Sequence, residues 1–503
     1  MTTSPAGRTR DGGPPSDRLA GRSQEDGAPE RTDVVTCFLR HRAEVLLVRR
    51  SSRVGSYRGR WGGVAGHVET EDPLQDARRE IEEETGLGDA VTLAGRGEPF
   101  TVDDPDAGRR WRVHPFLFDV SRRDFVLDWE AVEGEWVPPT AILERNCVPR
   151  LWTSYARVAP TLESVRADRQ HGAAYLSLRA LEVLRDRAAA VAAGVEAPGD
   201  ATPGGAGAVV GGRSGPVAGG EPARTDEDAL RVLARALRGA QPAMTALRNR
   251  LDRAMTGARD ACGTGGIAGD RRAAVAWSRA VAAAAQDVLE GALRAEDAVL
   301  ASAAGLVADR RVLTLSLSET LAQALLAARP APACVAVAES RPGGEGQVLA
   351  DRLAARGIDV ALVPDAAMAW ALERFDLDLV AVGADTVLPG GDVVNKVGTR
   401  VAALAAQASG TPFLAVAACD KIAPEGSVWD ASAAGEGDDA AYGGAPDPAP
   451  DRAADGRALW RSPLFERTPA ALVGGVVTET GVLDAEGVRR VAAQHARAGG
   501  WDR

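Results

Sequence analysis

Short runs of alternating hydrophobic and polar residues open the patterned part of the chain. The segment "DVVTCFLRHRAEVLLVRR" contains two β-rich runs around a short polar turn, which predicts a β-hairpin. Further strand-like runs follow at "WRVHPFLFDV" and "EWVPP", and one strongly helical segment lies between the hairpin and these runs. Leu178, Leu181 and Leu184 then share one helical face. Residues 33–190 are therefore expected to form one domain that ends in a trailing helix.

The second half of the chain changes from helices to alternating strands and helices. Alanine-rich helical pattern continues to about residue 304, after which short apolar runs such as "RVLTLSL", "CVAVAES" and "DLVAVGAD" alternate with helical segments. This alternation predicts a parallel, doubly wound sheet, an α/β fold whose ligands bind at the carboxyl ends of the strands. We expect a helical subdomain over 225–305 and a parallel-sheet subdomain over 306–500.

Three stretches are too polar or too rich in Gly and Pro to pack. Residues 1–32 read as a disordered tail, residues 191–224 as a flexible linker, and residues from about 424 to 456 as a disordered insert. No run of about 18 apolar residues is present, so no membrane span is expected. The tail has no apolar core, so it does not read as a signal peptide.

Composition narrows the class of protein further. The five cysteines have no CxxC spacing, which favours reduced thiols and a cytoplasmic location. The net charge is −11 and no basic stripe is present, so we expect no nucleic-acid partner.

A cluster of carboxylates marks the helical segment of the first half. Asp72 before Pro73 is a favourable helix start, and Gly86 marks its end. Within the segment, Glu80, Glu83 and Glu84 share one face, where their charges repel one another. A hard divalent cation would offset this repulsion, and Mg²⁺ binds carboxylate oxygens together with substrate phosphates.

The same segment resembles the Nudix box, GX5EX7REUXEEXGU, in which U is aliphatic and X is any residue. The helical half of the motif matches position for position at Arg79, Glu80, Ile81, Glu83, Glu84, Gly86 and Leu87. Glu71 matches the earlier glutamate, whereas Ala65 holds the first glycine position and Gly66 follows it.

The resemblance implies a Nudix α/β/α sandwich with a mixed sheet, and hydrolysis of a nucleoside diphosphate linked to another group. It implies that Glu80, Glu83 and Glu84 bind Mg²⁺ or Mn²⁺, with Glu71 and Arg79 in support. The general base stays open between Glu80 and a later acid such as Glu130 or Glu133.

Lysine use marks a second candidate site. Of the 59 Lys and Arg residues only two are lysine, Lys396 and Lys421. Helical spacing after Asn395 predicts a helix that starts near this residue, and a helix start at the carboxyl edge of a parallel sheet binds anions. Asp385 ends the strand before it, and Lys421 follows the next strand, so we expect a phosphate-binding crevice here.

The segments "ESRPGGEG", "GADTVLPGGDVVNKVGT" and "SPLFERTP" resemble the translation initiation factor 2B alpha/beta/delta family. That family includes ribose-1,5-bisphosphate isomerase and methylthioribose-1-phosphate isomerase. The resemblance covers about residues 225 to 500 and implies a Rossmann-like subdomain after a helical one, and a homodimer formed through this half. The resemblance implies ligand-site roles for Ser316, Asp385, Asn395 and Lys396, and Arg341 and Lys421 are further candidates for binding the ligand.

Ser316 departs from the isomerases, which have an acid/base cysteine at that strand end. A hydroxyl is a far weaker acid than a thiol, whose ordinary pKa is about 8.5. We therefore expect a Mg²⁺-dependent Nudix hydrolase fused to a domain that binds a sugar phosphate or nucleotide without isomerising it. Two alternatives remain open: a bifunctional hydrolase and sugar-phosphate isomerase, and an initiation-factor-like regulatory protein with a vestigial Nudix domain.

Overall fold

The computed structural model describes residues 31–104, 108–168, 171–199, 226–242, 244–263, 271–429 and 463–502. The expected tail, most of the expected linker and most of the expected insert lie outside these ranges.

The chain divides into two compact units. One comprises Met1–Pro160 and Ala189–Gly220, and the other comprises Thr161–Ala188 and Glu221–Arg503. The expected domain boundary at residue 190 differs from this division. Residues 161–188, which include most of the trailing helix, belong to the second unit because their buried side chains pack there, not in the first unit's core.

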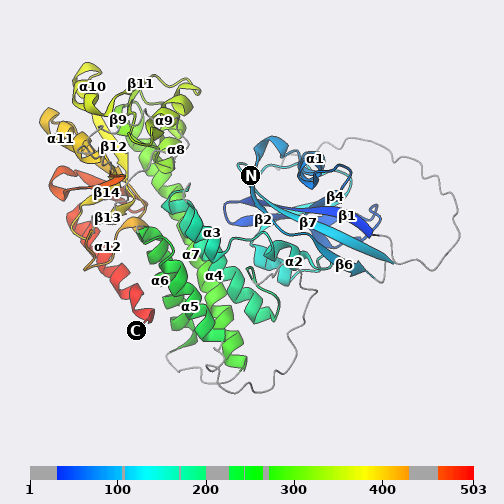
Figure 1. The fold of residues 1–503 in the computed structure, drawn as a ribbon. Coiled ribbons are helices and arrows are strands. Elements are labelled where there is room, and N and C mark those ends of the chain that lie inside the picture. Colours follow the sequence, from blue (N-terminus) through cyan, green and yellow to red (C-terminus); the bar gives the residue numbers. More distant parts are fainter. Residues whose placement is uncertain are drawn as a thin grey trace, which may run out of the picture. The chain divides into compact units, whose positions relative to one another are not determined.

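The first unit is built on one mixed sheet of eight strands (Figure 1). Its path runs β3-β2-β1-β7-β5, with β4 paired to β1, β6 to β7 and β8 to β2. β1 and β7 are parallel, and the other pairs are antiparallel. The strands are β1 (Arg31–His41), β2 (Glu44–Arg50), β3 (Trp61–Gly62), β4 (Val64–His67), β5 (Val91–Arg96), β6 (Phe100–Asp104), β7 (Arg109–Val120) and β8 (Ala131–Val137).

Helices cover both faces of this sheet. α1 (Pro73–Thr85) packs Ile81 against Val35 and Leu39 of β1, whose side chains alternate between the two faces. α2 (Leu151–Ala156) packs Trp152 on the opposite face, where Phe38 points. The arrangement confirms the expected α/β/α sandwich with a mixed sheet.

The second unit begins with helices, as expected. They are α3 (Leu162–Ala167), α4 (Ala173–Ala193, of which the last residues belong to the first unit), α5 (Asp226–Arg238), α6 (Thr245–Cys262) and α7 (Arg271–Val307). α5, α6 and α7 contact one another along their lengths (Figure 1).

A seven-stranded sheet follows, in the order β11-β10-β9-β12-β15-β17-β18. Every neighbouring pair is parallel except β17 with β18. The chain order reverses between β9 and β12, so the sheet is doubly wound with its switch point there. The strands are β9 (Arg311–Leu315), β10 (Cys334–Ala338), β11 (Val360–Val363), β12 (Leu379–Gly383), β15 (Phe413–Val416), β17 (Gly475–Thr478) and β18 (Gly481–Leu483).

Helices cover this sheet on both faces as well. α7, α8 (Glu319–Ala327) and α9 (Glu345–Ala354) pack their apolar side chains on one face. α10 (Met368–Arg374), α11 (Thr399–Ser409) and α12 (Ala485–Ala498) pack on the other. The expected helical subdomain and Rossmann-like parallel sheet are confirmed.

One local expectation is wrong. Residues 393–396 do not start a helix: they form β14 (Val393–Lys396), the middle strand of a small antiparallel sheet with β13 (Thr386–Val387) and β16 (Phe465–Thr468). α11 begins only at Thr399, because Gly398 turns the chain with φ 100°, a conformation that favours glycine.

Candidate functional site

The carboxylate helix α1 has both ends fixed locally. Asp72 accepts a hydrogen bond from the backbone N–H of Leu74, and Pro73 occupies the first turn. Gly86 ends the helix with φ 66°. The predicted start and end of this helix are therefore correct.

Strand β4 brings two backbone positions against the helix carboxylates. The N–H of Ala65 donates to Glu84 Oε1 at 3.2 Å. A Cβ on Gly66 would lie 2.0 Å from the Glu80 carboxyl carbon, so only glycine leaves room for this carboxylate. The displaced glycine of the motif is thus the residue that lies against Glu80, whereas Ala65 contributes through its backbone.

Burial and mutual repulsion raise the pKa values of Glu80 and Glu84. Burial raises the pKa of Glu84 well above its ordinary value, and the charges of Glu130, Asp128 and Glu80 add to this. Burial also raises the pKa of Glu80, with further contributions from Glu83 and Glu130. Glu84 is 7% exposed, whereas the Glu83 side chain is 57% exposed.

Glu130 belongs to the same cluster and Glu133 does not. Burial, followed by the charge of Asp128, raises the pKa of Glu130. Glu133 forms an ion pair with Arg49 at 2.7 Å, which engages its carboxylate elsewhere. Of the two later acids, Glu130 is therefore the one coupled to the helix glutamates.

Arg79 lies at the centre of the ion pairs on α1. Its guanidinium is 3.0 Å from Glu80, 3.2 Å from Glu83 and 3.5 Å from Glu69. Glu71 is exposed, and no described residue forms a hydrogen bond or ion pair with it. Arg79 therefore belongs to the carboxylate cluster. The acid beside Arg79 is Glu69, two residues before Glu71, which is the glutamate that matches the motif.

The residues fit a hard divalent cation by their chemistry. Within the described ranges, no three His, Cys, Asp or Glu side chains converge closely enough to hold a metal by themselves. Mg²⁺, however, takes one or two carboxylates and completes its shell with water and substrate phosphates. The buried Glu84 and the part-buried Glu80, with Glu83 at the surface, supply such oxygens.

A second site lies at the switch point of the doubly wound sheet. Ser316 directly follows β9 and Ser340 lies two residues after the end of β10, and both serines have positive φ, 60° and 63°. The N–H of Ser316 donates to Ser340 Oγ at 2.6 Å, and the N–H of Ser340 donates to Asp365 at 2.8 Å. Non-glycine residues in this backbone region are strained and tend to occur at functional sites.

Asp385 follows the neighbouring strand β12 at the same edge. A Cβ on Gly383 would lie 2.7 Å from Ser318, so this glycine lets the turn after β9 approach the end of β12. Burial raises the pKa of Asp385, although Lys421 and Lys396 act in the opposite direction. Within the described residues no side chain forms a hydrogen bond or ion pair with its carboxylate.

Both lysines reach this edge. Lys396 Nζ lies 2.6 Å from Glu345 Oε1, and the lysine side chain is 9% exposed. Lys421 Nζ donates to the carbonyl of Ala384 at 2.6 Å, and burial lowers its pKa. Asp385 and the two lysines are thus brought together as predicted.

The remaining predicted residues lie differently. Asn395 is buried and donates to Thr399 Oγ1 at 3.1 Å, so it supports the turn before α11. Glu466 Oε1 lies at the start of α11, where it accepts from the N–H of the cap residue Gly398 at 2.7 Å and from that of Arg400 at 2.9 Å. A carboxylate of the protein therefore occupies the helix start at which an anion site was expected.

Arg341 lies in the turn after β10. Its backbone N–H donates to Asp365 at 2.7 Å, and its side chain pairs with Glu339 at 3.4 Å. The residue therefore contributes to the same Asp365-anchored turn as Ser340, and its guanidinium is half exposed at the surface.

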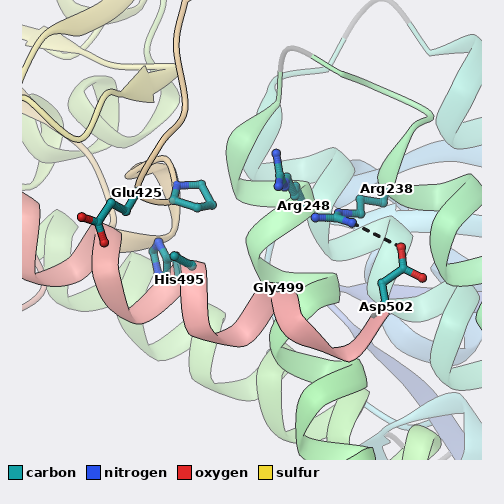
Figure 2. A pocket seen from close by; sticks show the side chains of 8 residues that line it. Arg238, Arg248, Glu425, His495, Gly499 and Asp502 are labelled. Carbon is teal, nitrogen blue, oxygen red and sulfur yellow. Dashed lines mark ion pairs between the residues drawn. The ribbon is translucent and has the colours of Figure 1, made fainter.

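A cavity of about 260 Å³ lies elsewhere in the second unit (Figure 2). It is lined by Arg238, Arg248, Glu425, His495 and Asp502 among others. Its arginines are engaged by carboxylates of the protein, since Arg238 lies 3.2 Å from Asp252 and 3.8 Å from Asp502. It contains no predicted site residue.

Sequence reasoning missed several partners of the predicted residues. Glu69, Asp128, Ser340, Glu345 and Glu466 complete the two sites. Glu345 lies in the segment "ESRPGGEG", but nothing in the sequence indicates that it pairs with Lys396. Asp128, two residues before Glu130, could have been found as a second acid next to the candidate base.

Two sequence families match separate parts of the chain. The NUDIX domain matches residues 30–158, and the initiation factor 2 subunit family matches residues 218–485. No helix in the described ranges has the length and apolar character needed to cross a membrane.

Several curated relatives match the second half. A probable bifunctional methylthioribose-1-phosphate isomerase/methylthioribulose-1-phosphate dehydratase of Nocardia farcinica is 40% identical over 188 residues, 35% of this chain and 33% of its own. A methylthioribose-1-phosphate isomerase of Gemmatimonas aurantiaca is 35% identical over 38% of this chain and 58% of its own. A ribose 1,5-bisphosphate isomerase of Archaeoglobus fulgidus is 32% identical over 30% and 46%. The chain therefore spans between a third and three fifths of these relatives.

Solved structures match over a larger share of the chain at lower identity. The translation initiation factor eIF-2B of Pyrococcus horikoshii covers 64% of this chain and 94% of its own, at 23% identity and a TM-score of 0.44. The 5-methylthioribose 1-phosphate isomerase of the same organism covers 73% and 89%, at 18% identity and a TM-score of 0.45.

Proposed function

Because the chain belongs to the initiation factor 2 subunit family and has a NUDIX domain before the family region, we propose that it is a bifunctional enzyme. Its first unit hydrolyses a nucleoside diphosphate linked to another group. Its second unit isomerises a pentose phosphorylated at carbon 1. The relatives of the second unit that are reported above are isomerases, which does not support the expectation of a domain that only binds its ligand.

The carboxylate cluster of α1 supports the hydrolase. Glu80, Glu83 and Glu84 would hold Mg²⁺, which polarises phosphoryl oxygens when bound. Burial raises the pKa of Glu130 above its ordinary value, which suits it to take a proton from the attacking water. Arg79 balances the charge of Glu80 and Glu83 and so keeps the cluster together.

Asp385 is the observation on which the isomerase chiefly rests. An isomerisation of this kind moves a proton between neighbouring carbons and needs a group that can take and return it. Burial raises the pKa of the Asp385 carboxyl, which suits this role. Lys396 and Lys421 supply positive charge for the phosphate at the same strand ends.

Ser316 favours a second candidate, a domain that binds the sugar phosphate without converting it. Its hydroxyl stands where the resemblance implies a cysteine, and it cannot supply a proton as readily as a thiol. The two candidates predict the same ligand class and differ only in turnover.

One set of assays separates these functions. A panel of nucleoside diphosphate compounds should be hydrolysed with Mg²⁺ to phosphate monoesters, which an added phosphatase converts to inorganic phosphate for detection, and this signal should be lost in Glu83→Gln. Methylthioribose 1-phosphate and ribose 1,5-bisphosphate should each be tested for ketose formation by NMR, beside Asp385→Asn and Ser316→Cys. Turnover lost in Asp385→Asn supports the isomerase. If the wild-type chain binds the sugar phosphate without converting it, and Ser316→Cys gains turnover, the second candidate is supported.

A further inference from the structure

A cavity of about 340 Å³ lies in the second unit at the carboxyl ends of β15 and β17. Asp420, in the turn after β15, and Glu479, directly after β17, line it from the sheet. Arg253 of α6 and Arg294 of α7 line it from the helices. No residue proposed above for either reaction lines this cavity.

Two neighbouring residues of the turn after β15 contact different groups. Asp420 bonds to Arg250 and Arg253 of α6. The next residue, Lys421, extends instead to the carbonyl of Ala384, beside Asp385. Asp420 therefore faces α6, whereas Lys421 faces Asp385 at the carboxyl edge of the sheet.

One face of α7 has only glycine and alanine at the cavity, apart from Arg294. Gly291, Ala295 and Ala298 follow helical spacing and line it together with Arg294. Glycine in a helix interior is destabilising relative to alanine by roughly 0.5–1 kcal/mol, and at Gly291 it leaves open the space beside Arg253 and Arg294.

Two guanidinium groups converge on that space. A Cβ on Gly291 would lie 3.8 Å from Arg253 Nη2 and 4.0 Å from Arg294 Nη2. Arg294 is 72% exposed, and its ion pair with Glu290 is long, at 3.6 Å. Each guanidinium pairs with one carboxylate, Arg253 with Asp420 and Arg294 with Glu290, and keeps further N–H groups that can donate to the oxygens of a phosphate.

We infer that this cavity is a second ligand site, which binds a phosphate monoester of a hydroxylated compound. The phosphate lies between Arg253 and Arg294. Glu479, whose Oε2 accepts the backbone N–H of Cys419 at 2.9 Å, is held in place to accept a hydroxyl. Gly291 gives the ligand its room.

Titration calorimetry of the full chain with ribose 5-phosphate tests this site, with Lys396→Ala as the background so that the crevice does not contribute. Gly291→Leu fills the cavity and should abolish binding, and Arg294→Ala should weaken it at least about tenfold. Gly305→Leu, in the same helix with nothing within 4 Å, and the exposed Arg279→Ala are matched controls and should bind like the background.

The inference is overturned if the background shows no binding, if Gly291→Leu binds as tightly as Gly305→Leu, or if unphosphorylated ribose binds as well as ribose 5-phosphate. Loss of hydrolase or isomerase activity elsewhere does not bear on it. The Lys396→Ala background therefore separates failure of this site from failure of the proposed isomerase.

Discussion

Glu84 shows how one buried carboxyl couples stability to the proposed chemistry. Its pKa is raised above the ordinary 4.5, so the folded chain holds its proton more tightly than the unfolded chain does. The resulting stabilisation is fully present below pH 4.5 and is lost as pH rises through the raised value. Ionising this carboxylate therefore costs the fold stability, as is common for residues selected for chemistry.

Glu84→Gln should consequently raise the thermal stability of the first unit at pH 8 but not at pH 4, while abolishing hydrolysis. Each unit of pKa shift corresponds to about 1.4 kcal/mol. Calorimetry at both pH values without divalent cations measures this. Glu83→Gln, at an exposed position, is the control and should change stability little. Equal destabilisation by Glu84→Gln at both pH values would contradict the prediction.

Glu130 and Glu133 offer a matched pair for the general base. Glu130→Gln should lower kcat by roughly 10²- to 10⁴-fold, since a positioned base contributes about that much. Glu133→Gln should have a much smaller effect, because Glu133 is paired with Arg49. Steady-state kinetics across pH compare the two variants. If Glu133→Gln is the more damaging, the base has been assigned to the wrong residue.

At the scale of elements, the contact between β4 and α1 depends on one missing side chain. Gly66→Ala would place a methyl group on the Glu80 carboxylate, 2.0 Å from its carbon. The flexible end of Glu80 can move aside, so folding should tolerate the change while activity falls by about 10- to 100-fold. Metal-dependent hydrolysis and thermal unfolding should be measured together.

Ala65→Gly is the matched control for that variant. It restores the glycine position of the motif and keeps the backbone N–H that donates to Glu84. Near-normal activity is expected. If Ala65→Gly is as damaging as Gly66→Ala, the role assigned to Gly66 is wrong.

A buried ion-pair network joins α6 to the turn after β15. Asp420, 3% exposed, accepts from Arg250 at 2.9 Å, and Arg250 also lies 3.1 Å from Glu296. Asp420→Asn removes the buried carboxylate that pairs with both Arg250 and Arg253, and should cost about 3–5 kcal/mol in the free energy of unfolding. Urea denaturation measures it. Glu486→Gln, which breaks the exposed pair with Arg490, should cost less than about 0.5 kcal/mol.

Elements with a regular pattern could be predicted from the sequence, and elements defined by distant partners could not. α1 was marked by its cap, its proline and its final glycine, and the parallel strands were marked by their apolar runs. β14 pairs with β16, about 70 residues away in sequence, so no local pattern could reveal it. The apolar spacing after Asn395 belongs to α11, and only the turn at Gly398 shifts the helix start.

The same limit applies to the sites. Glu80, Glu84, Asp385 and both lysines were predicted because motif spacing or composition singled them out. Glu345, which pairs with Lys396, was missed because that contact forms only when β14 and the start of α9 meet in the fold.

At the scale of the whole molecule, the expected homodimer through the second unit remains a proposal. Trp370 of α10 and Leu404 of α11 are about half exposed on two helices that contact each other, and such surfaces favour burial against a partner. Leu404→Glu should then convert a dimer to a monomer in light scattering. Val482→Glu, equally exposed on β18, is the control. A wild-type monomer, or a dimer unaffected by Leu404→Glu, would rule out this surface.

The rarity of lysine gives the molecule a built-in spectroscopic reporter. Protein labelled with ¹⁵N only at lysine side chains would contain two labelled ammonium groups, Lys396 and Lys421. Lys396 belongs to β14 and Lys421 follows β15, and the charges of both act on Asp385. A single mutation would assign both signals, and every ligand that enters the crevice would be recorded without background from the rest of the chain.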